Sequence, residues 1–187
     1  MEMDEEYRKY LAKILLDADT VQTRVAELGA QISEEYRTKG DLILLCILKG
    51  GVMFMVDLMR HITIPHKIDF MAVSSYGSGA RQSVGHVRIL MDMSADISDK
   101  HVLIVEDIID SGHTLSYIVP QLEARGPKSV KICTLLSKPS RREVDVPVEY
   151  LGFEIPNEFV FGYGLDLDER FRNLPFVGVV DLDKYKP

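Results

Sequence analysis

The stretch from His101 to Ser116 constrains this chain most, because its polarity changes abruptly in the middle. Val102 to Val105 is a short, apolar and β-branched run, which is typical of a buried strand. Glu106, Asp107 and Asp110 then place three carboxylates within five positions, and a helical apolar pattern follows. Strand, acidic corner and helix in this order predict a loop at the carboxyl end of a strand in an open α/β sheet, where such folds bind ligands.

The loop itself, Ser111-Gly112-His113-Thr114, has the composition of a phosphate cradle. Backbone N–H groups at a helix N-terminus attract anions, the two hydroxyls add donors, and Gly112 permits close backbone approach. The neighbouring carboxylates suit sugar hydroxyls or a magnesium ion. The pattern therefore favours a ligand with a phosphate, vicinal hydroxyls and a nearby metal, such as a ribose 5-phosphate. The alternative is an acidic surface loop that merely caps a helix.

Length and composition favour a single domain over residues 1–187, with 46% hydrophobic and 27% charged residues. The longest apolar run, Leu42 to Leu48, is too short to span a membrane, and the acidic N-terminus is unlike a secretory signal. Cys46 and Cys133 fall in predicted strands, so we expect reduced thiols and a cytoplasmic protein. A net charge of −7 argues against nucleic acid as a partner.

Strands and helices alternate along most of the chain. A helix that Asp17 can cap is expected before Gly40, and the pair Gly50-Gly51 precedes a second helix. The segment 77–85 is rich in Gly and Ser and is expected to be mobile. This order predicts an α/β fold with a parallel sheet and a small hood built from the N- and C-terminal segments, about 1–18 and 150–187. Expected strands cover 13–16, 42–48, 66–73, 87–91, 102–105, 129–136 and 176–180.

The sequence Val-Glu-Asp-Ile-Ile-Asp-Ser-Gly-His-Thr-Leu at 105–115 closely resembles the phosphoribosyl-pyrophosphate signature of type I phosphoribosyltransferases. The resemblance runs from about Lys13 to the C-terminus and is strongest to the hypoxanthine(-guanine) branch. It implies a Rossmann-like core and transfer of ribose 5-phosphate from phosphoribosyl pyrophosphate to a 6-oxopurine, hypoxanthine or guanine, in purine salvage. It also implies Mg²⁺ as cofactor, small-molecule substrates only, and a homodimer or homotetramer.

The resemblance assigns roles to the acidic loop. Glu106 and Asp107 are expected to hold the ribose hydroxyls and position the metal, with Asp166 as a further metal residue. The loop 110–114, namely Asp110, Ser111, Gly112, His113 and Thr114, is expected to bind the 5-phosphate. Asp110 is the candidate catalytic base, which would take a proton from the five-membered ring of the purine.

Three further segments are expected to bind pyrophosphate. Leu-Lys-Gly-Gly at 48–51 is similar to the family's pyrophosphate loop, in which the Leu-Lys peptide is often cis, so Lys49 and Gly50 are assigned there. Ser75 and Tyr76 are expected to close over the pyrophosphate together with a lid formed by 77–85. Arg172 is the last predicted pyrophosphate contact.

The purine base is expected to meet Lys138, Phe159, Val160 and Asp166. Lys138 would donate a hydrogen bond to the carbonyl at position six of the purine. A site with this donor would accept hypoxanthine or guanine and reject adenine, whose amino group at that position is also a donor. Phe159 would stack on the base, while the Val160 backbone would contact its edge. Most relatives carry Asp-Lys where this chain has Asn157-Glu158, so the order of preference among hypoxanthine, guanine and xanthine stays open.

Three alternative functions are less consistent with these residues, and one of them, a plain doubly wound phosphate binder, explains neither the lid nor the pair Lys138 and Phe159. A transferase for another base is the first, and Lys138 with Phe159 argues against its adenine version. A nucleotide-sensing regulator that keeps this fold and binds RNA is the second. The net acidity and the presence of Asp110 and Lys49 argue against that regulator.

Overall fold

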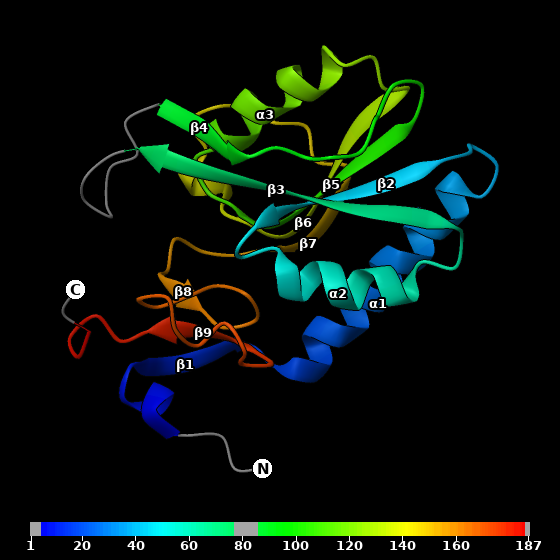
Figure 1. The fold of residues 1–187 in the computed structure, drawn as a ribbon. Helices are drawn as coiled ribbons and strands as arrows, with labels where there is room; N and C mark the ends of the chain where they lie inside the picture. Colours follow the sequence, from blue (N-terminus) through cyan, green and yellow to red (C-terminus); the bar gives the residue numbers. More distant parts are fainter. Residues whose placement is uncertain (1–4, 77–85, 186–187) are drawn as a thin grey trace.

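A computed structural model describes residues 5–76 and 86–185 and arranges them around two sheets (Figure 1). The larger sheet has the strand order β4-β3-β2-β5-β6-β7, and the smaller has the order β1-β9-β8. The strands are β1 (Leu11–Leu16), β2 (Leu42–Leu48), β3 (His66–Tyr76), β4 (His86–Met91), β5 (His101–Ile109), β6 (Ser129–Ser137), β7 (Tyr150–Glu154), β8 (Val160–Phe161) and β9 (Val177–Val180). The helices are α1 (Ala18–Tyr36), α2 (Val52–His61) and α3 (His113–Glu123), with 3₁₀ turns at Glu5–Lys9 and Pro139–Arg141.

The larger sheet is parallel except at one edge. Strands β3, β2, β5, β6 and β7 pair in parallel, whereas β4 runs antiparallel to β3. The centre of the sheet is apolar on both sides because helices cover both faces, as expected for parallel strands. The predicted α/β fold with a mostly parallel sheet is therefore confirmed. The terminal segment 150–187 divides between the two sheets, since β7 belongs to the larger one.

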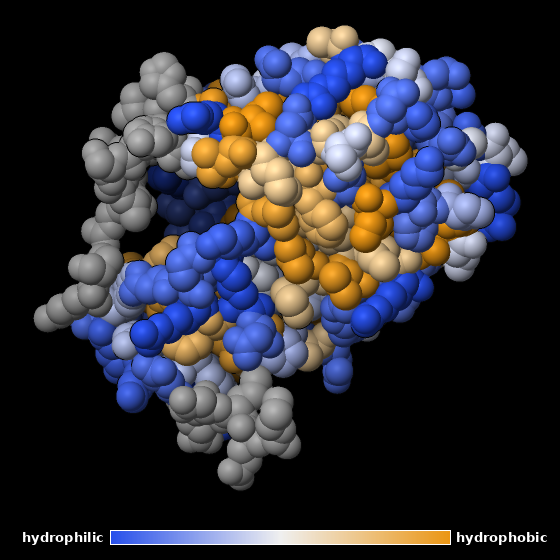
Figure 2. Space-filling model, in the orientation of Figure 1, coloured by the Kyte–Doolittle hydropathy of each residue, from blue (hydrophilic) through white to orange (hydrophobic). Residues whose placement is uncertain are grey.

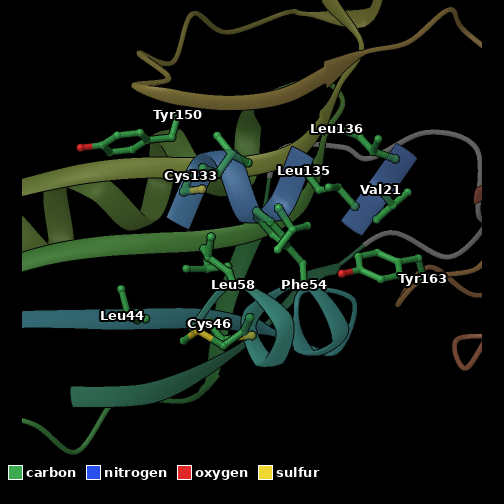
Figure 3. Packing of buried hydrophobic residues seen from close by; sticks show 14 of the residues in the cluster. Val21, Leu44, Cys46, Phe54, Leu58, Cys133, Leu135, Leu136, Tyr150 and Tyr163 are labelled. Carbon is green, nitrogen blue, oxygen red and sulfur yellow. The ribbon is translucent and has the colours of Figure 1, made fainter. Parts of the chain in front are cut away.

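Alternate residues of each central strand face different helices. Leu44 and Cys46 of β2 pack in the cluster with α1 and α2, whereas Ile43 and Leu45 pack in the cluster with α3. Figure 3 shows the first of these clusters at close range. Asp17 caps α1 by accepting a hydrogen bond from the Thr20 backbone N–H at 2.8 Å, as predicted. The apolar face of α1 is buried against the sheet and α2, and it consists of Val21, Val25, Leu28, Ile32 and Tyr36.

The smaller sheet joins segments from the two ends of the chain. β1 pairs antiparallel with β9, which pairs antiparallel with β8. A separate apolar cluster lies behind it: Phe161, Leu167, Leu174, Phe176 and Val180. In Figure 1 this sheet lies below the carboxyl end of the larger one, and Figure 2 shows a hollow with hydrophilic walls between the two parts. The fold thus leaves a polar space beside the strand ends that carry the candidate site residues.

Some sequence predictions need adjustment or cannot be followed. The helix expected after the acidic corner, α3, begins at His113, so His113 and Thr114, which were expected in the loop, lie in its first turn. Of the aromatic residues at 159, 161 and 163, Phe161 and Tyr163 are buried and Phe159 is 45% exposed. The expected lid over 77–85 lies outside the described residues. In the part of the chain that is described, no helix is both long and apolar enough to cross a membrane.

Candidate active site

The loop after β5 forms the N-terminus of α3. Gly112 is the helix N-cap with φ +91°, a left-handed conformation that glycine adopts without strain. A Cβ at this position would lie 2.4 Å from the Val144 carbonyl oxygen, so a larger residue would collide with backbone. The Gly112 carbonyl accepts from the Ser116 N–H at 3.0 Å, which closes the first turn of the helix. The predicted phosphate loop therefore has the shape that such a helix terminus requires.

A neighbouring connection holds this loop in place. The backbone N–H groups of Glu143 and Val144 both donate to the Ser111 carbonyl at 3.0 Å. The Glu143 carboxylate also lies 2.8 Å from Nε2 of His113. The loop is thus supported from outside the strand and helix that it joins, which fixes its position before any ligand binds.

Two acidic side chains at the end of β5 lie in a poorly solvated position. Glu106 is 9% exposed, and its buried Oε2 forms no hydrogen bond with any described residue. Burial, followed by the charge of Asp107, raises the pKa of Glu106 well above its usual range. Burial likewise raises the pKa of Asp107 to about 6, although the backbone N–H of Ile108 donates to its carboxylate at 2.8 Å. Such groups favour a ligand that supplies hydrogen-bond donors or positive charge.

Backbone forms the wall opposite these carboxylates. A Cβ at Gly50 would lie 1.6 Å from Oδ2 of Asp107, so the glycine leaves the space that this carboxylate occupies. A Cβ at Gly164, whose φ is +99°, would lie 2.1 Å from the Gly50 carbonyl oxygen. The Leu48-Lys49 peptide is cis, as the resemblance implied. The turn after β2 therefore packs directly on the end of β5 and on the loop around Gly164.

The loop around Gly164 is tied to α2 by a polar contact. The Tyr163 hydroxyl donates to Oδ2 of Asp57 at 2.7 Å, and the Gln22 amide donates to the same oxygen at 2.7 Å. Figure 3 shows Tyr163 beside α2. Because Asp57 lies in α2 and Gln22 in α1, two helices hold the Gly164 loop against Gly50.

The predicted pyrophosphate cations meet at one acidic residue. Lys49 Nζ lies 2.8 Å from Oε2 of Glu169, and Arg172 Nη2 lies 3.3 Å from the same oxygen. Arg172 also pairs with Asp166 at 2.9 Å and donates to the Gly164 carbonyl at 2.8 Å. The structure thus brings Lys49, Arg172 and Asp166 together through Glu169. Ser75 and Tyr76 end β3, and their side chains lie outside the described part of the chain.

Lys138 and Asp110 form a second pair of candidate residues. Lys138 follows β6, is 6% exposed, and its backbone N–H donates to the Ile109 carbonyl at 3.0 Å. Its ammonium lies 4.0 Å from Oδ2 of Asp110, while Nε of Arg141 lies 3.2 Å from Oδ1. Burial lowers the pKa of Lys138, and the charge of Asp110 opposes that effect. A buried lysine thus stands beside the candidate base.

The remaining base residues lie in the small sheet. Val160 is buried in β8, where it pairs with Val179, whereas the ring of the preceding Phe159 is exposed. The Phe159 ring lies 6.1 Å from the Tyr185 ring, centroid to centroid. Tyr185 in turn donates to Asp168 at 2.6 Å. Phe159 therefore offers a free face for stacking while the C-terminal segment supports it.

Magnesium fits this donor set in a particular way. The described residues contain no group of three or more His, Cys, Asp or Glu side chains that could hold a metal ion. Magnesium is commonly bound by one or two carboxylates together with substrate phosphates and water. Asp107 and Asp166 lie close enough for the charge of Asp166 to raise the pKa of Asp107, and Oε2 of Glu106 has no hydrogen-bond partner among the described residues. These carboxylates are therefore compatible with magnesium that arrives with a phosphorylated substrate.

Sequence reasoning missed three residues that shape the site. Glu169 pairs with both of the cations that were predicted to bind pyrophosphate, Arg141 pairs with Asp110, and Gly164 packs on Gly50. Glu169 occupies a turn with φ +62° that lacks the Asn-Gly or Asp-Gly signal of such turns. Arg141 lay in a segment with no periodicity. Gly164 could have been identified from the sequence, because the run Gly162-Tyr163-Gly164 places a tyrosine between two glycines.

The comparisons with known proteins agree with this geometry. Residues 12–168 match the phosphoribosyl transferase domain, and the chain belongs to that family. The hypoxanthine phosphoribosyltransferase of Salmonella typhimurium is 53% identical over 93% of this chain and 98% of its own length. The hypoxanthine-guanine phosphoribosyltransferase of Mycobacterium tuberculosis is 49% identical over 97% of this chain and 92% of its own. The predicted family is confirmed.

The solved structures support the same assignment. A crystal structure of a hypoxanthine phosphoribosyltransferase from Staphylococcus aureus covers 100% of both chains with a TM-score of 0.93 and 44% identity. A hypoxanthine-guanine phosphoribosyltransferase from Bacillus anthracis, which holds a HEPES molecule in its active site, covers 91% of this chain with a TM-score of 0.84 and 40% identity. The fold is therefore that of these transferases.

The burial of Asp107 predicts a pH dependence of stability. The pKa of Asp107 is about 6 in the folded protein, against an ordinary 3.8. Between these two pH values the folded state binds more protons than the unfolded state, so the free energy of unfolding falls as the pH rises. Asp107→Asn should remove that part of the slope and raise the free energy of unfolding at pH 8 by about 1–3 kcal/mol. Urea unfolding at pH 4.5 and pH 8 measures both values. Asp183→Asn, an exposed control, should leave the slope unchanged, and an Asp107→Asn variant that is less stable at pH 8 would contradict the prediction.

Proposed function

We propose that the chain transfers ribose 5-phosphate from phosphoribosyl pyrophosphate to hypoxanthine, and to guanine, and releases pyrophosphate. This is the purine-salvage reaction named for its relatives. The observation that carries the proposal is the buried Lys138 beside Asp110. That pair puts a donor for a purine carbonyl next to a carboxylate at the start of the phosphate loop.

The loop after β5 would hold the phosphoribosyl group. The N-terminus of α3, with Ser111, Gly112, His113 and Thr114, would bind the 5-phosphate through backbone N–H groups and hydroxyls. Glu106 and Asp107 would accept hydrogen bonds from the ribose hydroxyls, which would give the unpartnered Glu106 Oε2 its donors. Burial of these carboxylates makes such bonds stronger than they would be in water.

The leaving group would lie between the turn after β2 and the segment after Gly164. Lys49 and Arg172 would stabilise the negative charge that develops on pyrophosphate, with Gly50 providing backbone close to it. Magnesium, held by Asp166 and Asp107 or Glu106, would supply further charge stabilisation when bound with the substrate. Ser75 and Tyr76 would close over this end of the site and exclude water.

The purine would bind on the opposite side of the ribose. Phe159 would stack on its face, and the Val160 backbone would contact its edge. Lys138 would donate to the six-carbonyl, and Asp110 would accept the proton from the ring nitrogen that forms the new bond. Nε of Arg141, 3.2 Å from Oδ1 of Asp110, would help to hold this carboxylate in position for that role.

We further propose one domain over 1–187, with the small sheet as its hood, a cytoplasmic location, and a homodimer or homotetramer. Buried, unpaired Cys46 and Cys133 support a reducing compartment. Exposed Ile68, Leu90 and Met91 on the paired strands β3 and β4 support association through that edge.

A spectrophotometric assay tests the reaction. The purified protein is given phosphoribosyl pyrophosphate and Mg²⁺ with hypoxanthine, guanine, xanthine or adenine in parallel. We expect turnover of hypoxanthine and guanine that is lost when the metal is chelated, and no turnover of adenine. The comparison among the first three bases also shows which base is preferred by a chain with Asn157-Glu158 at this position. The Glu158 carboxylate pairs with Lys13 at 2.8 Å and thus points toward β1. A folded protein inactive with all four bases would refute the proposal.

Asp110→Asn tests the catalytic base. The amide keeps the size of the side chain but cannot take a proton, so kcat should fall about 100-fold or more. Binding of phosphoribosyl pyrophosphate, measured by calorimetry, should change by less than about threefold because the loop backbone stays in place. Equal losses in both quantities would mean that Asp110 only shapes the loop.

Lys138→Ala tests base recognition. Loss of a charged hydrogen-bond donor should lower kcat/KM for hypoxanthine by about ten- to a hundredfold. Lys128→Ala, at the other end of β6, removes an equal charge from an exposed position and should have no effect. If the two variants show the same base profile as the unchanged protein, Lys138 lies outside the site.

A further inference from the structure

One carboxylate oxygen contacts both cations assigned to pyrophosphate. Oε2 of Glu169 lies 2.8 Å from Lys49 Nζ and 3.3 Å from Arg172 Nη2. These two cations come from distant parts of the chain, the turn after β2 and the segment before β9. An anion that bridges them therefore occupies the position where a bound pyrophosphate would make its contacts.

The backbone holds Glu169 in this position. Asp168 and Glu169 have φ of +52° and +62°, and Leu167 and Arg170 on either side exchange backbone hydrogen bonds of 3.1 Å. These features define a tight two-residue turn of the I′ type, which Asp168 tolerates at its first position but which is strained for a glutamate at its second. The Glu169 N–H donates to Asp166 at 3.0 Å, and Tyr185 donates to Asp168. Several contacts thus direct this glutamate at the cations.

We propose that Glu169 is an internal competitor for the pyrophosphate site. Its carboxylate neutralises Lys49 and Arg172 while the site is free, leaves them when phosphoribosyl pyrophosphate binds, and returns to them as pyrophosphate departs. This inference rests on the proposed function, because it requires that these two cations bind pyrophosphate.

The exposure of the ion pairs suits an exchange of partners. The side chains of Lys49 and Glu169 are 67% and 65% exposed, so their attraction is weakened by water and salt. A pyrophosphate group carries several charges and binds with magnesium, so it can displace a single carboxylate. Arg172 is only 24% exposed and keeps its hydrogen bond to the Gly164 carbonyl, so it stays in place during the exchange.

Competition predicts that removing the carboxylate tightens pyrophosphate binding. Inorganic pyrophosphate with Mg²⁺ is titrated calorimetrically into the unchanged protein, Glu169→Gln and Asp168→Asn. Glu169→Gln should lower the Kd by about two- to tenfold, which corresponds to the loss of two exposed ion pairs. Asp168→Asn removes an equal charge one residue away, and asparagine tolerates the left-handed backbone, so its Kd should stay unchanged.

The matched variants separate the possible outcomes. A lower Kd in Glu169→Gln alone supports the competitor. An equal decrease of the Kd in both variants would mean that only the negative charge of the region matters. An unchanged or higher Kd in Glu169→Gln would mean that Glu169 does not compete with pyrophosphate. Either result overturns the inference and leaves the proposed function standing. If none of the three proteins binds pyrophosphate, the assignment of the site fails and the inference falls with it.

Discussion

The burial of two carboxylates at the end of β5 is the constraint on which the site depends. Glu106 and Asp107 lose water on burial, which raises the pKa of each, and the charge of Arg172 offsets only part of this effect at Asp107. A fold tolerates such a cost where function needs it, because a hydroxylated or metal-bearing ligand recovers the lost interactions. The apolar packing of β2 and β5 on both faces of the sheet stabilises the fold and offsets this local cost.

The carboxyl edge of the parallel sheet explains why residues far apart in sequence meet. Lys49 follows β2, Asp110 follows β5 and Lys138 follows β6, and these strands are neighbours. The segments that flank the strands of the small sheet carry Phe159, just before β8, and Arg172, between β8 and β9. The larger sheet thus positions one group of the candidate residues, and the part of the chain that contains the small sheet positions the other.

Sequence patterns predicted most of the fold and many candidate residues. Strands such as Leu42–Leu48 and the buried face of α1 follow directly from periodicity, because burial on one or two faces leaves a clear apolar repeat. The contacts of Glu169 and Arg141 could not be predicted, because long-range ion pairs leave no local pattern. The segment 150–187 was harder to divide, since short strands such as β8 have too few residues to show a period.

The packing of Gly50 between Gly164 and Asp107 has a consequence for engineering. This wall of the site consists of main chain, and each glycine leaves room for its neighbour. A library of side-chain substitutions therefore has no room at Gly50 or Gly164 themselves, and near them it is limited to side chains such as those of Lys49 and Arg172. Redesign of the proposed acceptor preference would start elsewhere, at Lys138 and Phe159, the side chains that we propose to contact the base.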